Sequence, residues 1–300
     1  MNDLAFTAAN LTKRYGSLAA LDGLTAGVGA NSITGLVGRN GSGKTTLMRI
    51  AAGKLDVTSG EANVFGQAPM NNLNVLPRVV YNYHNYPHRP GTRLRDILTG
   101  FSILYPAFDS AFAAKLLDFF GLTPKMKYGK LSQGMASVFN FLTALAARAS
   151  LTLLDEPVLG MDVATRRAIY DILLRDAMEH PRAFIVSSHL LTELEGILSD
   201  LILIEEGRLL LSGAIDDIRS SAYRVDGPPE AVAAYCTGRN VLHRGGPPLN
   251  SFAVIHEPLT GGANEEIRHR GLEVSNVRVE DLYVYLTKQG REEELECLWN

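Results

Sequence analysis

One loop, GRNGSGKT from Gly38 to Thr45, constrains the fold of this 300-residue chain more than any other feature. Its spacing, G-x-x-x-x-G-K-T, is that of a phosphate-binding loop, in which backbone N–H groups surround a β-phosphate and the lysine reaches the β- and γ-oxygens. Glycine is required where the chain turns tightly against the phosphates, because a Cβ there would collide or force a disfavoured φ. The loop predicts a nucleotide site.

The residues on either side of the loop support this interpretation. The apolar run from Ile33 to Val37 predicts a buried strand, and residues 43–52 predict a helix whose positive N-terminal end faces the phosphates. Lys44 would reach phosphate oxygens, and Thr45 would coordinate Mg²⁺. The predicted nucleotide-binding residues of the loop are Gly38, Asn40, Gly41, Ser42, Gly43, Lys44, Thr45 and Thr46.

Composition narrows the class of partner. The chain has 29 Lys and Arg against 32 Asp and Glu, a net charge of -3, so we expect no general attraction to nucleic acid and no nucleic-acid partner. Its two cysteines, Cys236 and Cys297, form no C-x-x-C pair, which disfavours a zinc site or a disulfide framework. The start MNDLAFTAAN is not typical of a signal peptide, and no run approaches the ~20 apolar residues of a spanning helix.

Helices alternate with strands after the loop, which predicts an α/β fold with a mostly parallel sheet covered on both faces. Residues 4–37 are typical of a strand-rich, antiparallel region, and the segment 279–287 fits either a helix or a strand. The other predicted elements are helices at 93–101, 112–122, 163–178 and 192–199, strands at 151–157 and 183–189, and a strand pair turning at Gly207.

A second acidic motif lies downstream of the loop. The segment LTLLDE from Leu151 to Glu156 is an apolar strand that ends in two carboxylates. Asp155 would lie near the coordination shell of Mg²⁺, and Glu156 would polarise an attacking water. A metal bound by Thr45 needs such an acidic partner on a neighbouring strand.

With these residues in place, further motifs follow in order. LSQGM at Leu131–Met135, VLGMD at Val158–Asp162 and SSH ending at His189 resemble the signature, D-loop and switch histidine of ABC transporter ATPase subunits. Tyr15 stands where that family places the aromatic ring that stacks on adenine. The resemblance runs from about residue 4 to about residue 215.

The resemblance implies an ABC-type P-loop fold that binds ATP with Mg²⁺ and hydrolyses it. It implies a head-to-tail dimer in which Ser132 and Gly134 contact the γ-phosphate held by the opposite subunit, and Asp162 links the two sites. His189 would hydrogen-bond the γ-phosphate and the attacking water, and Glu156 would be the general base. On this basis we expect an ATPase cassette at 1–220, with a helical subdomain at about 85–145, and a small α+β appendage at 221–300.

The chain departs from the family pattern at two places. His84 stands where the family has a glutamine that contacts Mg²⁺ and water, so we predict His84 as a metal ligand and catalytic group, with slower or more pH-sensitive hydrolysis. The signature has Gln133 and Met135 at its third and fifth positions. The helix after it is unusually apolar, which fits either tight internal packing or a contact face for a partner.

Weaker motifs point to one branch of the family. LSQGM, LYPAFD at Leu104–Asp109 and the C-terminal VRVEDLYVYLT resemble the bacterial branch that drives exporters of drugs, bacteriocins or antibiotics. In that branch the membrane-spanning permease is a separate chain, so the resemblance implies a permease partner, a homodimer of cassettes and a peripheral place on the cytoplasmic side of the membrane. The aromatic run Tyr81–His88 fits either a permease socket or local packing.

Three alternatives stay open from the sequence. A soluble ABC ATPase of DNA repair, translation or cofactor assembly would share every nucleotide motif, although the chain has no long heptad insertion and no second cassette. If the chain were an unrelated P-loop kinase or GTPase, LSQGM and SSH would have to match the ABC motifs by chance. A degenerate cassette would bind ATP with little turnover. The presence of Lys44, Asp155, Glu156 and His189 argues against this alternative.

Overall fold

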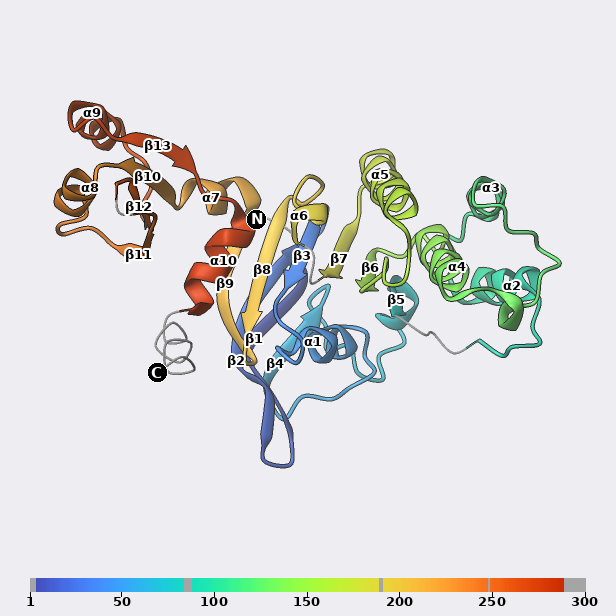
Figure 1. The fold of residues 1–300 in the computed structure, drawn as a ribbon. Coiled ribbons are helices and arrows are strands. Elements are labelled where there is room, and N and C mark those ends of the chain that lie inside the picture. Colours follow the sequence, from blue (N-terminus) through green and yellow to red (C-terminus); the bar gives the residue numbers. More distant parts are fainter. Residues whose placement is uncertain (1–3, 84–87, 189–190, 248, 289–300) are drawn as a thin grey trace, which may run out of the picture. The chain divides into compact units, whose positions relative to one another are not determined.

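The computed structural model describes residues 4–83, 88–188, 191–247 and 249–288 (Figure 1). The chain divides into two compact units, Met1–Ser212 and Gly213–Asn300, which we call the first and second units and describe separately. The division falls earlier than the boundary expected at residue 220, because α7 (Ile215–Ser220) groups with the second unit.

A six-stranded sheet forms the centre of the first unit. Its inner strands are short apolar runs that are buried on both faces, which is the expected state of a parallel sheet covered by helices. Neighbouring strands from β5 to β8 pair in parallel, so their carboxyl ends lie at one edge of the sheet. The spatial order is β5 (Val79–Tyr83), β6 (Leu151–Asp155), β7 (Ala183–Ser188), β3 (Ile33–Val37), β8 (Asp200–Glu205) and β9 (Arg208–Ala214).

A smaller antiparallel sheet covers one side of this core and confirms the strand-rich start of the chain. Helix α1 (Lys44–Ala51) packs between the two sheets, because its Leu47, Met48 and Ile50 belong to a core cluster that includes residues of both. The strands of the smaller sheet are, in spatial order, β2 (Leu18–Gly29), β1 (Leu4–Tyr15) and β4 (Ser59–Val64).

The opposite face of the central sheet is covered by the segment that follows β7. A Cβ on Gly35 of β3 would lie 2.5 Å from Leu198 Cδ1, so this leucine packs directly on the strand. Helix α6 (Leu191–Leu194) is much shorter than the helix predicted at 192–199, and that prediction was wrong. Ser199 instead donates its backbone N–H to Ile33 O at 3.0 Å, which starts β8.

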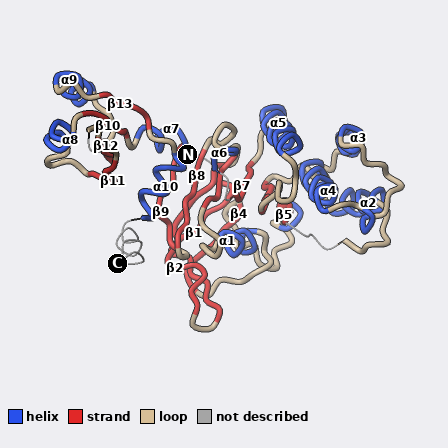
Figure 2. Tube along the Cα trace, in the orientation of Figure 1, coloured by secondary structure: helices blue, strands red, loops and turns tan. Residues whose placement is uncertain are grey.

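Helices α2 (Leu94–Leu104), α3 (Ser110–Phe119) and α4 (Gln133–Ala146) form a helical subdomain of the first unit, and Figure 2 shows α2 and α3 farther from the strands than α4. Asp109 caps α3 by accepting a hydrogen bond from Phe112 N at 2.8 Å. Every residue of α4 from Val138 to Ala146 is buried. The apolar character of this stretch therefore serves packing within the chain.

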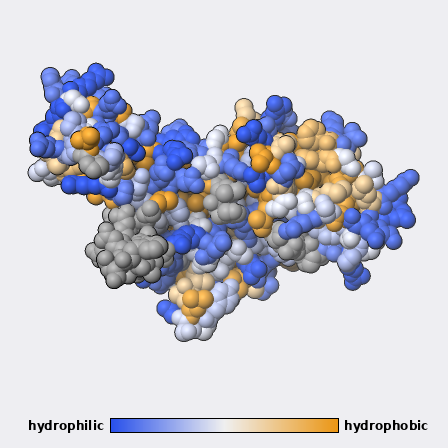
Figure 3. Space-filling model, viewed as in Figure 1, coloured by the Kyte–Doolittle hydropathy of each residue, from blue (hydrophilic) through white to orange (hydrophobic). Residues whose placement is uncertain are grey.

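A longer helix, α5 (Val163–Glu179), lies between the helical subdomain and β7 (Figure 1). Its Val163 and Met178 are exposed, at 55% and 73%, and Figure 3 shows apolar colour on the surface around α5.

Among the helices of the described residues, none is long and apolar enough to cross a membrane.

The second unit has a β-α-β-β-α-β order. Its antiparallel sheet runs β11-β12-β10-β13, the arrangement of a ferredoxin-like fold. Tyr223, Tyr235 and Ile267 lie in its separate core. The segment 279–287, which fitted helix or strand, belongs to a helix. The elements are β10 (Tyr223–Gly227), α8 (Pro229–Tyr235), β11 (Val241–Gly245), β12 (Ser251–Ile255), α9 (Gly261–His269), β13 (Glu273–Asn276) and α10 (Val279–Lys288).

Candidate nucleotide site

The glycine-rich loop joins β3 to α1 at the carboxyl edge of the central sheet. Gly41 and Gly43 have φ values of 84° and 109°, which favour glycine. A Cβ on Gly38 would lie 2.2 Å from Ile204 O of β8, so no larger residue fits there. The loop is therefore held in a conformation that its glycines alone permit.

The loop and the first turn of α1 contain polar groups that the helix itself does not satisfy. The first hydrogen bond within α1 runs from Leu47 N to Gly43 O at 2.9 Å, so the N–H groups of the first helical turn have no acceptor inside the helix. Among the residues that the structure describes, the buried Ser42 Oγ also has no hydrogen-bond partner. Such a helix N-terminus is a natural site for a phosphate group.

Lys44 lies inside this loop, and only 7% of it is exposed. Its Nζ donates hydrogen bonds to Gly38 O at 2.7 Å and to Arg39 O at 3.0 Å. Burial lowers the pKa of the Lys44 amine, while the nearby charges of Glu156 and Asp155 raise it. The structure thus brings the predicted lysine and both predicted carboxylates into one electrostatic site.

Asp155 ends β6 and is 5% exposed. Two hydroxyl groups hold its carboxylate: Ser187 Oγ donates to Oδ1 at 2.6 Å, and Tyr81 OH donates to Oδ2 at 3.0 Å. Burial and the Asp155 charge raise the pKa of the Tyr81 phenol, so Tyr81 stays a donor. Sequence reasoning missed Ser187 and Tyr81, although a serine inside the apolar run AFIVSS was a usable signal.

Glu156 follows Asp155 and has a φ of 50°, an unusual conformation for a residue with a side chain. Its backbone N–H donates to Ser187 Oγ at 2.9 Å, so one serine fixes both acidic residues. Strained residues of this kind cluster at functional sites. The half-buried Glu156 is therefore held where β6 ends, beside the loop lysine.

The signature residues lie at the start of α4, well apart from α1 in Figure 1. The exposed Ser132 caps α4, and its Oγ accepts a hydrogen bond from Met135 N at 3.2 Å. A Cβ on Gly134 would lie 3.3 Å from Gly160 O, which places the signature against the D-loop of the same chain. Among the described residues no hydrogen bond joins Ser132 or Gly134 to the glycine-rich loop.

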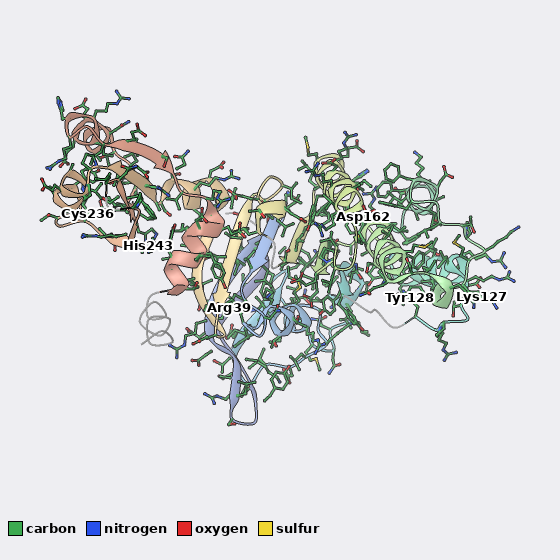
Figure 4. The ribbon with its side chains drawn as sticks, viewed as in Figure 1. Arg39, Lys127, Tyr128, Asp162, Cys236 and His243 are labelled. Atoms are coloured by element: carbon green, nitrogen blue, oxygen red, sulfur yellow. The ribbon has the colours of Figure 1, made fainter. Side chains whose placement is uncertain are left out.

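Two further predicted residues are exposed. Asp162, labelled in Figure 4, caps α5 and accepts hydrogen bonds from Thr165 N at 3.0 Å and Thr165 Oγ1 at 2.7 Å. The backbone hydrogen bond from Thr165 lowers the pKa of the Asp162 carboxyl. Tyr15 ends β1 with 47% of its surface exposed, and Lys13 Nζ lies 5.5 Å from the centre of its ring. Such an exposed ring can stack on a planar base.

The remaining predicted groups, His84 and His189, lie outside the described residues. Within the described part of the chain, no group of three or more His, Cys, Asp or Glu residues is arranged to hold a metal ion. Mg²⁺ commonly binds through one or two protein groups together with substrate phosphates, so Thr45 and Asp155 fit that mode.

The fold and the loop together define a P-loop nucleotide-binding protein. The ABC transporter family matches residues 21–159. The bacitracin transport ATP-binding protein BcrA of Bacillus licheniformis is 30% identical over 214 residues, which cover 70% of each chain. The Nod factor export ATP-binding protein I of Burkholderia orbicola (strain AU 1054) is 28% identical over 94% of this chain and 96% of its own length.

A solved ATP-binding subunit of an ABC transporter has the same fold, with a TM-score of 0.65, 21% identity, and coverage of 72% of this chain and 92% of that one. The chain therefore belongs to the ABC transporter family and is one of its ATP-binding subunits, an ATPase. The resemblance inferred from the sequence motifs is confirmed.

Proposed function

We propose that the chain hydrolyses Mg²⁺-bound ATP to drive an exporter whose membrane-spanning permease is a separate subunit. The observation that carries the catalytic part is the joint placement of Lys44, Asp155 and Glu156 at the carboxyl edge of the central sheet, where the carboxylate charges partly offset the effect of burial on the pKa of Lys44. The relatives that act in bacitracin transport and Nod factor export support the exporter.

The roles at the site follow from its geometry. The loop amides and Lys44 bind the phosphates, and Thr45 and Asp155 would hold Mg²⁺, which neutralises charge on the phosphate oxygens. Glu156 polarises the attacking water as general base. Tyr15 would stack on adenine, His189 would hydrogen-bond the γ-phosphate and the attacking water, and His84 would help to hold the metal.

The second half of the site comes from another cassette, which we propose to be an identical copy. Ser132 is exposed at the start of α4 and is not bonded to the loop of its own chain. A second copy placed head to tail would supply Ser132 and Gly134 to the γ-phosphate, with Asp162 at the interface. ATP binding would then close the dimer, and hydrolysis would reopen it.

A hollow of about 370 Å³ beside the start of α4 is our candidate contact for the permease. Tyr128 and Gln133 line it, and Tyr128 is labelled in Figure 4. The described aromatic residues near it pack within the chain: the Tyr81 and Tyr83 rings stack at 5.0 Å, and the His88 ring lies 4.8 Å from that of Tyr128. We therefore place the contact at the hollow, on the cytoplasmic side of the membrane.

The two units carry different tasks in this proposal. Residues up to 212 form the ATPase cassette, which holds every described nucleotide-site residue. Its helical subdomain would transmit the movement of the cassette to the permease. The ferredoxin-like second unit folds around its own core.

ATP turnover by the purified chain tests the catalytic part. Glu156→Gln keeps the shape of the side chain and removes the base, so turnover should fall at least about a hundredfold while ATP still binds. Glu179→Gln, at an exposed glutamate at the end of α5, is the matched control and should behave as wild type. Full turnover by Glu156→Gln would overturn the assignment of Glu156.

Recovery of partners tests the transporter. Tagged Glu156→Gln, loaded with Mg-ATP in detergent-solubilised membranes of the native cell, should retain a polytopic membrane protein in stoichiometric amount. Recovery of soluble proteins only, with the chain absent from the membrane fraction, would overturn the exporter proposal and leave the ATPase intact.

A further inference from the structure

Asn82 is a polar residue within the apolar strand β5. It is 5% exposed and lies in register with Leu154 of β6. Its Oδ1 is buried and has no hydrogen-bond partner among the described residues. A buried amide oxygen without a partner lowers stability, so its presence in a sheet core requires an explanation.

A small cavity lies between Asn82 and Glu156. Its volume is about 10 Å³, and its lining includes Asn82, Ser137, Asn140 and Glu156. That volume suffices for one water molecule, and a buried water needs two to four polar partners. The lining supplies an amide oxygen, a hydroxyl, a second amide and a carboxylate, so the cavity has both the size and the chemistry of a water site.

We propose that Asn82 holds one water molecule against Glu156 and thereby fixes the orientation of the Glu156 carboxylate. The water donates one proton to Asn82 Oδ1 and the other to a carboxylate oxygen of Glu156. Asn82 is thus a positioning residue that acts through Glu156. The inference rests on the proposed role of Glu156 as general base.

The other wall of the cavity belongs to the signature helix α4. Ser137 Oγ donates to Leu159 O at 3.4 Å, and Asn140 Nδ2 donates to Tyr128 OH at 3.0 Å. Displacement of α4 relative to β5 would change the space for the water. The water would therefore make the orientation of Glu156 depend on the position of the signature helix.

A matched pair of substitutions tests the inference. Thr and Val have nearly the same shape and both suit a strand, but only Thr offers an oxygen to the water. We expect Asn82→Val to lower kcat for ATP hydrolysis about three- to tenfold, which is the effect of one net hydrogen bond, with KM for ATP unchanged. Asn82→Thr should keep kcat within about twofold of wild type.

Thermal unfolding of the same variants separates positioning from structural support. Asn82→Val removes a buried polar group that no described protein group satisfies, so its Tm should equal or exceed that of wild type. Equal kcat for the Thr and Val variants, or a kcat loss that follows a lowered Tm in both, would overturn the inference.

Glu156→Gln measured in parallel separates the two proposals. If it turns over ATP as wild type does, the role of Glu156 fails and the inference fails with it. If it is inactive while Asn82→Val is fully active, only the water site is refuted. A high-resolution crystal structure of the full chain gives a direct check, because it should show an ordered water within hydrogen-bond distance of Asn82 Oδ1.

Discussion

Asp176 near the end of α5 is the centre of a buried ionic network that should dominate the stability of the first unit. Arg148 and Arg182 both pair with its carboxylate, the latter at 2.5 Å. The three side chains are 3%, 11% and 7% exposed for Asp176, Arg148 and Arg182. Burial lowers the pKa of the Arg182 guanidinium, and the Asp176 charge opposes that shift.

Replacement of Asp176 by Ala would leave two arginines without their shared acid. Arg148 keeps an ion pair with Asp109 at 3.2 Å. Arg182 keeps hydrogen bonds to the carbonyl oxygens of His180 and Leu145 and a contact with the Phe184 ring at 4.5 Å, but no ion pair among the described residues. Breaking a buried pair by removing one partner costs about 3–5 kcal/mol. Each kcal/mol shifts Tm by about 2–4 °C in a domain of 150–250 residues, so we expect Tm to fall by about 6–20 °C.

Calorimetry of the purified chain gives this Tm directly. Asp216→Ala is the matched control, because Asp216 pairs with Arg219 on the surface at 86% exposure and such pairs contribute about 0–1 kcal/mol. A loss below about 1 kcal/mol for Asp176→Ala would refute the reasoning. It would show that water or side-chain rearrangement satisfies the two guanidinium groups.

Three further predictions concern the site and its surroundings. Gly38→Ala should weaken ATP binding at least about tenfold in calorimetric titration, because the new Cβ would meet Ile204 O at 2.2 Å; unchanged affinity would contradict the assigned loop geometry. Ser187→Ala should cost about 1.5–3 kcal/mol in urea unfolding, since Asp155 loses a hydroxyl donor at 2.6 Å; a cost near zero would argue against that bond. A backbone N–H of α3 holds the pKa of Asp109 below its ordinary 3.8, so its stabilising effect is present above pH 3.8 and is lost as pH falls through the lower native value. Asp109→Asn should remove that part of the acid dependence in unfolding followed by circular dichroism, and an unchanged pH profile would refute it.

The nucleotide site could be predicted from the sequence because its signals are local. The glycine spacing depends on backbone conformation within a few residues, and the structure shows that conformation in the positive φ of Gly41 and Gly43. Short apolar runs such as Ile33–Val37 became buried strands for a similar reason. Predicted roles for individual site residues, including His84 and His189, stay predictions.

Elements that depend on distant contacts could not be predicted in the same way. The helix expected at 192–199 ends at Leu194, because Ser199 bonds to Ile33 at the start of β3 and Leu198 packs on Gly35. These contacts outweigh local helix propensity. The ferredoxin-like order of the second unit also arises from pairings between short strands that glycine and proline separate, such as β11 with β12.

Asn82 is a residue that neither local sequence signals nor the packing of distant segments explains. In β5 the neighbouring Val80 and Tyr81 are buried, and an apolar residue at position 82 would pack there without penalty. An unsatisfied buried amide oxygen instead costs about 1–3 kcal/mol. A single polar residue in an otherwise apolar core departs from the usual sequence pattern, and such departures are expected at functional sites. The cavity that Asn82 shares with Glu156 explains the asparagine. A water that bridges the two residues would satisfy the Asn82 amide oxygen and would hold the Glu156 carboxylate in one orientation.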